Sequence, residues 1–175
     1  MNLLLRRKML MEQAPKTALL NVADISMMQI QWGRLTRPTD TDGLLYLNNP
    51  NTDEVGAYQS DVIVPPNLAN TKHYISFFVQ GSVRVGITKS LYGGYYLQQS
   101  RTSESLQRVS LIITKNQFYS NQNGLIFGLS PGSILKKPMI LNLTQIYGAG
   151  NEPTQAEMDA IVDAHGGYWS GTINI

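Results

Sequence analysis

Runs in which apolar and polar residues alternate cover most of the chain from about Asn21 to Thr144. Alternation with a period of two predicts β-strands that bury one face and expose the other. The runs are rich in Val, Ile, Tyr and Phe, and turn residues interrupt them at short, even intervals. We expect eight or nine strands, eight of them in Ser26–Leu35, Gly56–Val64, His73–Gln80, Ser82–Lys89, Tyr95–Ser100, Gln107–Lys115, Gly124–Ser130 and Met139–Leu143.

The connections between these runs carry turn chemistry. Asn123 and Gly124 form the Asn-Gly pair that is favoured in hairpins, and Gly81 is placed to form a tight turn between two runs. In the run before Gly81, Ile75, Phe77 and Val79 share one face. Alternation of this kind is typical of antiparallel sheets with one packed face. The sequence therefore predicts an all-β fold, an antiparallel β-sandwich.

One helix is expected near the C-terminus, from about residue 155 to residue 165. Thr154 and Glu157 have the spacing of a capping box, in which each side chain bonds the backbone of the other residue. Met158, Ile161, Val162 and His165 follow at helical spacing, so one stripe of the helix should pack on the sandwich. Gly166 is a suitable helix stop.

The composition of the 175 residues excludes several classes of function. There is no cysteine, so disulfides, thiol nucleophiles and thiolate metal sites are absent, and the two histidines are too few for a multi-histidine centre. The net charge of +2 is too small to indicate nucleic-acid binding. No apolar run has the length of a membrane-spanning helix. We find no Gly-x-Ser-x-Gly motif, no phosphate loop and no distinctive carboxylate pair, and we expect no enzyme and no cofactor.

The first 20 residues differ from the rest and are predicted to form an N-terminal arm, with residues 21–175 as the sandwich domain. The segment up to Lys16 has a net side-chain charge of +3 and two short apolar runs. We expect no export signal, since the apolar run precedes the charges. The arm is either a frayed terminus or a segment that docks on a neighbouring subunit, with membrane-surface or nucleic-acid contact as lesser alternatives. The residues expected to anchor it are Leu3, Leu4, Leu5, Arg6, Arg7, Lys8, Met9 and Leu10.

The C-terminal stretch Leu141–Thr172 resembles a tail found on many bacteriophage virion proteins. The matching residues are Leu143-Thr144, the string Gly148-Ala149-Gly150-Asn151-Glu152-Pro153-Thr154, and His165–Trp169, while Asn142 replaces the usual acidic residue. Upstream, the stretches YISFFVQGS, SLQRVSLIIT and GLIFGLSPGS resemble strands of the carbohydrate-binding-module-like jelly rolls that carry such tails. The resemblance covers roughly residues 55–172 and does not include the N-terminal arm.

This resemblance implies a non-enzymatic structural protein of a tailed bacteriophage, located in the virion. The leading hypothesis is an auxiliary capsid, head-decoration or head-fibre protein whose N-terminal arm binds another virion protein of the capsid or tail. The alternative is a carbohydrate-binding adhesion module of the tail or baseplate that contacts host surface glycans. A homo-oligomer is compatible with either hypothesis, although the sequence shows no trimerisation heptad.

Candidate glycan-binding residues lie in one tyrosine- and glycine-rich stretch. They are Tyr92, Tyr95, Tyr96 and Gln98, because sugars stack on exposed aromatic rings and bond amide side chains. The alternative is that these tyrosines cover a sheet edge or an intersubunit contact.

Other aromatic and acidic residues are assigned structural roles. Trp32 and Tyr58 are expected in the core, and Trp169 is expected to pack the helix end onto the sandwich. Three acids in turn-rich stretches, Asp40, Asp42 and Asp53, favour plain turns over a calcium site, and no metal is expected.

Overall fold

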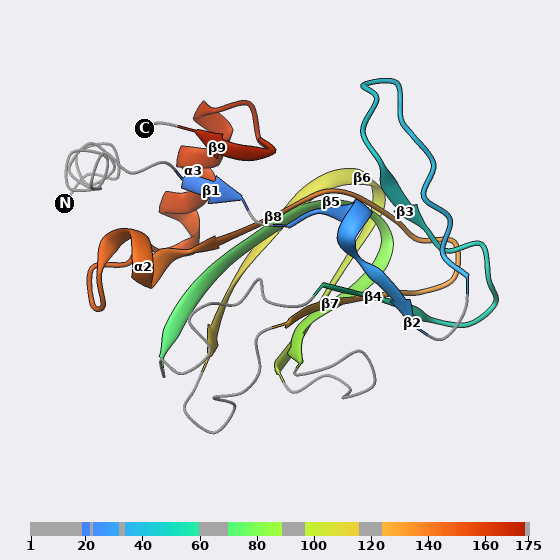
Figure 1. Ribbon diagram of the computed structural model, residues 1–175, viewed down its shortest axis with the longest axis horizontal. Coiled ribbons are helices and arrows are strands. Elements are labelled where there is room, and N and C mark those ends of the chain that lie inside the picture. Colours follow the sequence, from blue (N-terminus) through green and yellow to red (C-terminus); the bar gives the residue numbers. More distant parts are fainter. Residues whose placement is uncertain are drawn as a thin grey trace.

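The computed structural model describes residues 19–21, 23–31, 34–59, 70–88, 97–115 and 124–173. Within these ranges the chain is mostly antiparallel β-structure with two short α-helices (Figure 1). The elements are β1 (Leu19–Asn21), a 3-10 turn η1 (Ile25–Met27), β2 (Gln29–Gln31), β3 (Tyr46–Asn48), β4 (Val55–Gln59), β5 (Thr71–Thr88), β6 (Leu97–Lys115), β7 (Gly124–Leu129), β8 (Ile134–Asn142), α2 (Leu143–Tyr147), α3 (Gln155–Ala164) and β9 (Gly171–Ile173).

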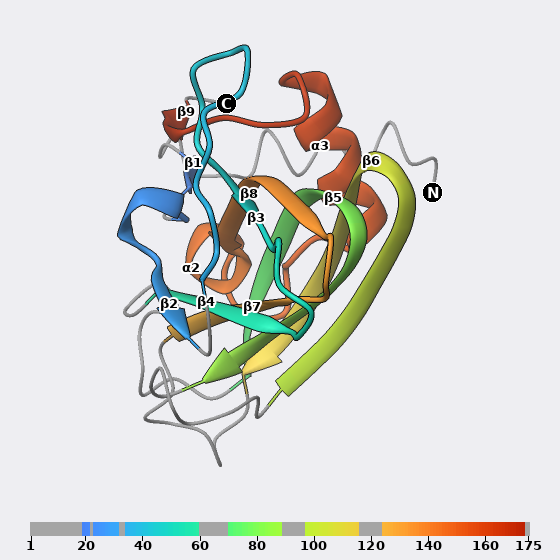
Figure 2. The same ribbon diagram turned by 90° about the vertical axis from the view of Figure 1, so that its right-hand side faces the viewer.

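A long antiparallel pair, β5 with β6, organises the main sheet. The first half of β5 pairs on its other side with β8, from His73 to Gln80, and its second half pairs with β7, from Val83 to Thr88. The seven-stranded sheet has the order β2-β4-β7-β5-β8-β3, with β6 attached to β5. Figures 1 and 2 show this sheet curling so that its two halves face each other.

The predicted turn at Gly81 is wrong, and the two predicted strands on either side of it form the single strand β5. Gly81 has a positive φ of 87°, and the β5–β6 register shifts between Val79 and Gly81. Glycine with positive φ serves a β-bulge as well as a turn. The described part of the predicted strand Tyr95–Ser100, which begins at Leu97, and the predicted strand Gln107–Lys115 likewise belong to one strand, β6. Figure 1 shows β6 bending together with β5.

The corner of the curled sheet is fixed by hydrogen bonds between β5 and the β7–β8 connection. The Ser133 hydroxyl accepts a hydrogen bond from the Ser82 backbone N–H at 2.9 Å and donates one to the Ser82 carbonyl at 3.0 Å. The Ser130 N–H donates to the same carbonyl at 3.0 Å. Strands that change layer at a bulge make such corners in β-sandwiches.

The main core lies between the two halves of the sheet. Ile75, Phe77 and Val79 are fully buried on one face of β5, as their alternation predicted. The Phe77 ring from one half meets the Phe127 ring from the other edge-to-face, with centroids 5.3 Å apart. Tyr58 is also buried, which confirms its predicted core position, whereas Trp32 lies outside the described residues.

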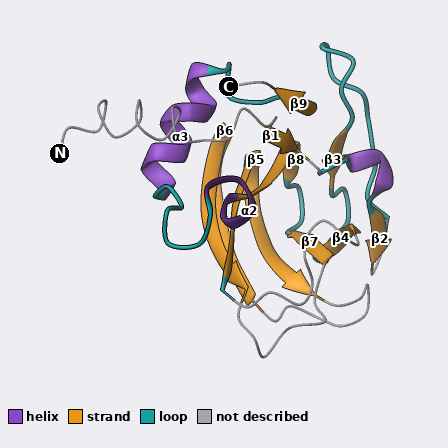
Figure 3. Ribbon diagram, turned by 60° about the vertical axis from the view of Figure 1, so that its left-hand side comes forward, coloured by secondary structure: helices purple, strands orange, loops and turns teal. Residues whose placement is uncertain are grey.

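A second apolar cluster covers the outer face of the β8 half. The capping box of Thr154 and Glu157 is present, and α3 ends at Ala164 with His165 as its C-cap, close to the predicted bounds. The helix buries Met158, Ile161 and Val162 against the sheet, and Figure 3 shows α3 beside β5 and β6. Trp169 belongs to the same cluster, so its predicted packing role is confirmed.

The structure adds elements that the sequence patterns did not predict. The short helix α2 follows β8 directly, and the Asn142 side chain caps it by accepting a hydrogen bond from the Gln145 N–H. Strands β1 and β9 form a separate two-stranded sheet. Since β1 begins at Leu19, it overlaps the last two residues of the predicted arm. No helix in the described part of the chain has the length and hydropathy needed to cross a membrane.

Candidate ligand-binding sites

Most of the residues predicted to bind glycan or virion partners lie outside the described ranges. These are Tyr92, Tyr95 and Tyr96 in the tyrosine-rich stretch, and Leu3, Leu4, Leu5, Arg6, Arg7, Lys8, Met9 and Leu10 in the arm. Gln98 is in β6, where its backbone pairs with Gly86. The prediction for these side chains therefore stays a prediction.

The strand ends show where the tyrosine-rich stretch is attached. The chain leaves β5 at Thr88, which pairs with Gly124, and it returns at Leu97, which pairs with Ile87. Gln59 at the end of β4 pairs with Leu125 beside them. The ends of β4 and β5 and the starts of β6 and β7 therefore lie together, toward the bottom of Figure 1. The connection that carries the tyrosines joins two of them, the end of β5 and the start of β6.

A cleft of about 480 Å³ lies on a different side of the molecule, where the C-terminal tail meets the N-terminal strand. The lining comes from the segment after β1, the hairpin before β3, the middle of β8 and the tail before β9; Figure 1 shows where these elements lie. We call it the tail cleft. Its walls come from four segments that are distant in sequence, and its lining residues include Asp24, Leu44, Leu45, Lys137, Tyr168 and Ser170.

Buried Asn21 holds the walls of the tail cleft together. Its amide nitrogen donates hydrogen bonds to the carbonyls of Pro138 at 3.2 Å and Trp169 at 2.9 Å. Its amide oxygen accepts from the N–H groups of Ala23 and Ile140, both at 3.0 Å. One side chain therefore links β1, β8 and the tail, next to the bulge in β8 where Lys137 has a positive φ of 51°.

The tail cleft combines polar groups with apolar surface. Burial raises the pKa of the Tyr168 hydroxyl, and the negative charge of Asp24 raises it further. The Lys137 ammonium pairs with Asp42 at 3.1 Å. Leu45 is 36% exposed and Met27, on the adjoining 3-10 turn, is 68% exposed. The size of the cleft falls in the range of about 300–1,000 Å³ that is usual for small-molecule sites.

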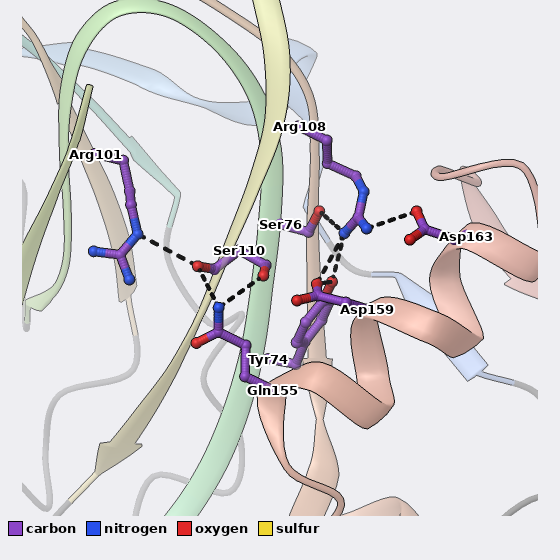
Figure 4. Close-up of polar contacts among 8 residues, drawn as sticks. All are labelled: Tyr74, Ser76, Arg101, Arg108, Ser110, Gln155, Asp159 and Asp163. Carbon is purple, nitrogen blue, oxygen red and sulfur yellow. Dashed lines mark hydrogen bonds and ion pairs between the residues drawn. The ribbon is translucent and has the colours of Figure 1, made fainter. Parts of the chain in front are cut away.

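A polar network under α3 attaches the helix to the sheet (Figure 4). Arg108 donates to Asp159 at 3.0 Å, to Asp163 at 2.6 Å and to the Tyr74 hydroxyl at 2.8 Å. The Tyr74 hydroxyl in turn donates to Asp159 at 2.6 Å. Burial, followed by the hydrogen bond and charge of Asp159, raises the pKa of Tyr74. Gln155 adds bonds to the Ser110 carbonyl and hydroxyl, both at 3.1 Å. Because these polar groups bond one another, the network has a structural role: it attaches α3 to β5 and β6.

The motif Gly148–Thr154 also has a structural role in the described chain. Glu152, whose side chain is only 3% exposed, accepts hydrogen bonds from the Thr144 hydroxyl at 2.8 Å and the Gly150 N–H at 2.9 Å. Its carboxylate pairs with the Lys72 ammonium at 3.4 Å. Burial alone raises the pKa of Glu152, but these hydrogen bonds outweigh burial and hold the pKa below the usual 4.5.

We expect Glu152→Gln to remove an acid-sensitive part of the stability. A carboxyl whose pKa is lowered by folding stabilises the folded state above its unfolded pKa, and this contribution is lost as the pH falls through the folded pKa. Urea unfolding at pH 7 and below pH 4 should show a large loss of stability on acidification in the wild type and a smaller loss in the variant. Equal losses in both proteins would contradict the assigned role of Glu152.

Asp40, one of the three acids considered for calcium, stabilises a turn. The Asp40 carboxylate accepts from the N–H groups of Leu44 and Asp42, both at 3.0 Å. The bond from Leu44 is the main cause of the lowered pKa of Asp40. Among the described residues, no group of three His, Cys, Asp or Glu side chains is arranged to hold a metal ion.

The chain matches no protein-family model and no curated protein. Its fold is similar to that of CsCBM6-3 from Clostridium stercorarium, solved in complex with cellobiose, with 9% identity and a TM-score of 0.50 over 71% of this chain and 94% of that one. A CBM4 structure has 14% identity and a TM-score of 0.48 over 72% and 94%. Tailspike protein 4 of bacteriophage CBA120, in its enzymatically active domain, has 10% identity and a TM-score of 0.46 over 68% and 20%.

The similarity to CsCBM6-3 is a similarity of fold. At a TM-score of 0.50 and 9% identity, this chain and CsCBM6-3 share a carbohydrate-binding-module-like antiparallel β-fold. The predicted fold class, an all-β antiparallel sandwich with a short C-terminal helix, is therefore confirmed, with α2 as an additional short helix.

Proposed function

We propose that this chain is a non-enzymatic carbohydrate-binding module of a bacteriophage virion that attaches to glycans on the host surface. The single observation that carries the proposal is the curled β-fold that it shares with CsCBM6-3, a module solved with a bound disaccharide. The tail motifs, Gly148–Thr154 and His165–Trp169, support the virion assignment through their resemblance to phage virion proteins.

The tyrosine-rich stretch is the proposed glycan contact. It connects two strand ends at an edge of the sheet, which is where loops of β-sandwiches carry binding residues on a rigid scaffold. The tyrosine rings would stack on sugar rings, and Gln98 would bond sugar hydroxyls.

We expect the double change Tyr95→Ala and Tyr96→Ala to weaken binding to host cells at least about tenfold, since truncation of aromatic anchors costs about 2 kcal/mol or more at binding hot spots. The measurement is a binding isotherm of labelled protein on intact bacteria. Tyr46→Ala in β3 is the matched control, since it removes a tyrosine from a different strand. Unchanged affinity of the double variant would remove the tyrosine-rich stretch from the site.

A second function, decoration of the capsid or head, is favoured by the composition of the arm. An apolar and basic segment of net charge +3 up to Lys16 precedes β1 and suits docking on an acidic virion surface. Other virion proteins, or further copies of this chain in a homo-oligomer, would be its partners.

Deletion of residues 1–16 tests this second function. We expect the shortened protein to be lost from purified virions, because the arm supplies the attachment, while the fold is retained. Quantitative mass spectrometry of particles grown with either version gives the occupancy. Virions that carry the shortened protein at full occupancy would exclude an anchoring role for the arm.

A further inference from the structure

We propose that the tail cleft is a second saccharide-binding site, formed by Asp24, Tyr168 and Ser170 against an apolar wall of Leu44 and Leu45. The proposal rests on the proposed carbohydrate-binding function and adds a site that the tyrosine-rich stretch does not include.

The shape of the tail cleft suits a small ligand. Its volume of about 480 Å³ is lined by the start of η1 and the segment before it, the loop 43–45, the bulge at Lys137 and Pro138, and the tail from residue 168 to residue 171. Asn21 fixes three of these segments through hydrogen bonds to Pro138, Trp169 and Ala23 backbone atoms, so these walls are held in place without a ligand. A preformed site loses less conformational entropy on binding.

The polar groups of the tail cleft have unused hydrogen-bonding capacity. One carboxylate oxygen of Asp24, Oδ1, accepts from the Ser26 N–H at 2.8 Å and from the Ser26 hydroxyl at 2.7 Å. Within the described chain, the other oxygen, Oδ2, and the hydroxyls of Tyr168 and Ser170 have no hydrogen-bond partner. A carboxylate acceptor beside two hydroxyl groups matches the alternating donors and acceptors of a sugar.

The charge and the apolar surface of the tail cleft favour an uncharged ligand that has both polar and apolar faces. Asp24 disfavours an anionic ligand, and the positive charge of Lys137 is already balanced by Asp42 at 3.1 Å. The Tyr168 ring, Leu44 and Leu45 offer apolar surface for the C–H face of a sugar ring. These features together fit a neutral saccharide, which has polar edges and apolar faces.

The test is a titration of the ¹⁵N-labelled full chain with cellobiose, maltose and lactose at millimolar concentrations, followed by NMR. We expect at least one sugar to shift the amide signals of Ser170 and Gly171. Asp24→Asn keeps the cap of η1 but removes the charged acceptor Oδ2, and Tyr168→Phe keeps the ring but removes the hydroxyl. Each change should weaken that binding about tenfold. Asp53→Asn, an exposed acid outside the cleft, is the matched control and should bind as the wild type does.

Three results would overturn the proposal, and they separate it from the proposed function. A sugar that shifts other amides but not those of the tail cleft would eliminate this site and leave the proposed function intact. Equal effects of Asp24→Asn and Asp53→Asn would also eliminate the site alone. The absence of any shift with all three sugars would eliminate the site, and if host-cell binding were absent as well, the proposed function would fall with it.

Discussion

Gly81→Ala should destabilise the protein by about 2–5 kcal/mol, the sum of about 1–2 kcal/mol for a left-handed alanine and about 1–3 kcal/mol for overpacking. The added Cβ would lie 2.4 Å from the Ser133 Oγ and 2.9 Å from the Ser133 Cα. Because the second of these atoms belongs to the backbone and cannot rotate away, the corner of the curled sheet has to open. Since Ser133 also bonds Ser82, the variant should weaken the pairing of β5 with both β7 and β8.

Gly132→Ala is the matched control for Gly81→Ala. Gly132 also has a positive φ, of 72°, but an added Cβ would meet no atom within 4 Å. The control should therefore lose only the strain of about 1–2 kcal/mol. Urea unfolding of the three proteins measures the difference. Equal destabilisation by the two changes would mean that the close approach of β5 to Ser133 does not define the corner.

Asn21→Ala should lower the free energy of unfolding by about 3–5 kcal/mol, because four backbone groups lose their hydrogen-bond partner. Each buried group left without a partner costs about 1–3 kcal/mol, and the cost is smaller where water can replace the lost partner. The four groups are the carbonyls of Pro138 and Trp169 and the N–H groups of Ala23 and Ile140. The tail after Trp169 should become the first site of limited proteolysis, since its attachment to β8 depends on this side chain.

Asn51→Ala serves as the comparison for Asn21→Ala. The Asn51 amide donates to the Arg34 carbonyl at 2.8 Å and to the Asn49 side-chain oxygen at 2.7 Å. The bond to Arg34 is exposed, so water can replace it, and Asn49 Oδ1 keeps its bond from the Asn51 N–H. The loss should be about 1–2 kcal/mol, typical of two hydrogen bonds whose partners keep other contacts or water. A value for Asn21→Ala as small as that for Asn51→Ala would contradict the role of Asn21 in joining β1, β8 and the tail.

Local sequence patterns predicted the parts of the fold that depend on interactions between residues close together in the chain. The alternation of Ile75, Phe77 and Val79 predicted a buried face, and the spacing of Thr154 and Glu157 predicted the start of α3. Gly81 could not be assigned in the same way, because a positive-φ glycine fits both a turn and a bulge. The choice between them depends on β7 and β8, whose residues lie at least 36 positions along the chain from the β5 residues they pair with.

The tail cleft could not be predicted for a related reason. Tyr168 and Asp24 are 144 positions apart in the chain and are brought together by the pairing of β1 with β9, strands of three residues each. Such short strands have no measurable alternation. The one local signal was the Gly166-Gly167 pair before Tyr168, where both glycines have a φ of 81° and the chain turns away from α3 toward the cleft.

The most direct test of the proposed function is the binding of purified, fluorescently labelled protein to intact host bacteria, with free sugars as competitors. The proposal predicts saturable binding that a specific sugar inhibits. Saturable binding that no sugar inhibits, or no binding at micromolar concentrations of a multivalent form of the protein, would contradict glycan recognition. The chain would then be better described as a structural decoration protein whose partners lie within the virion.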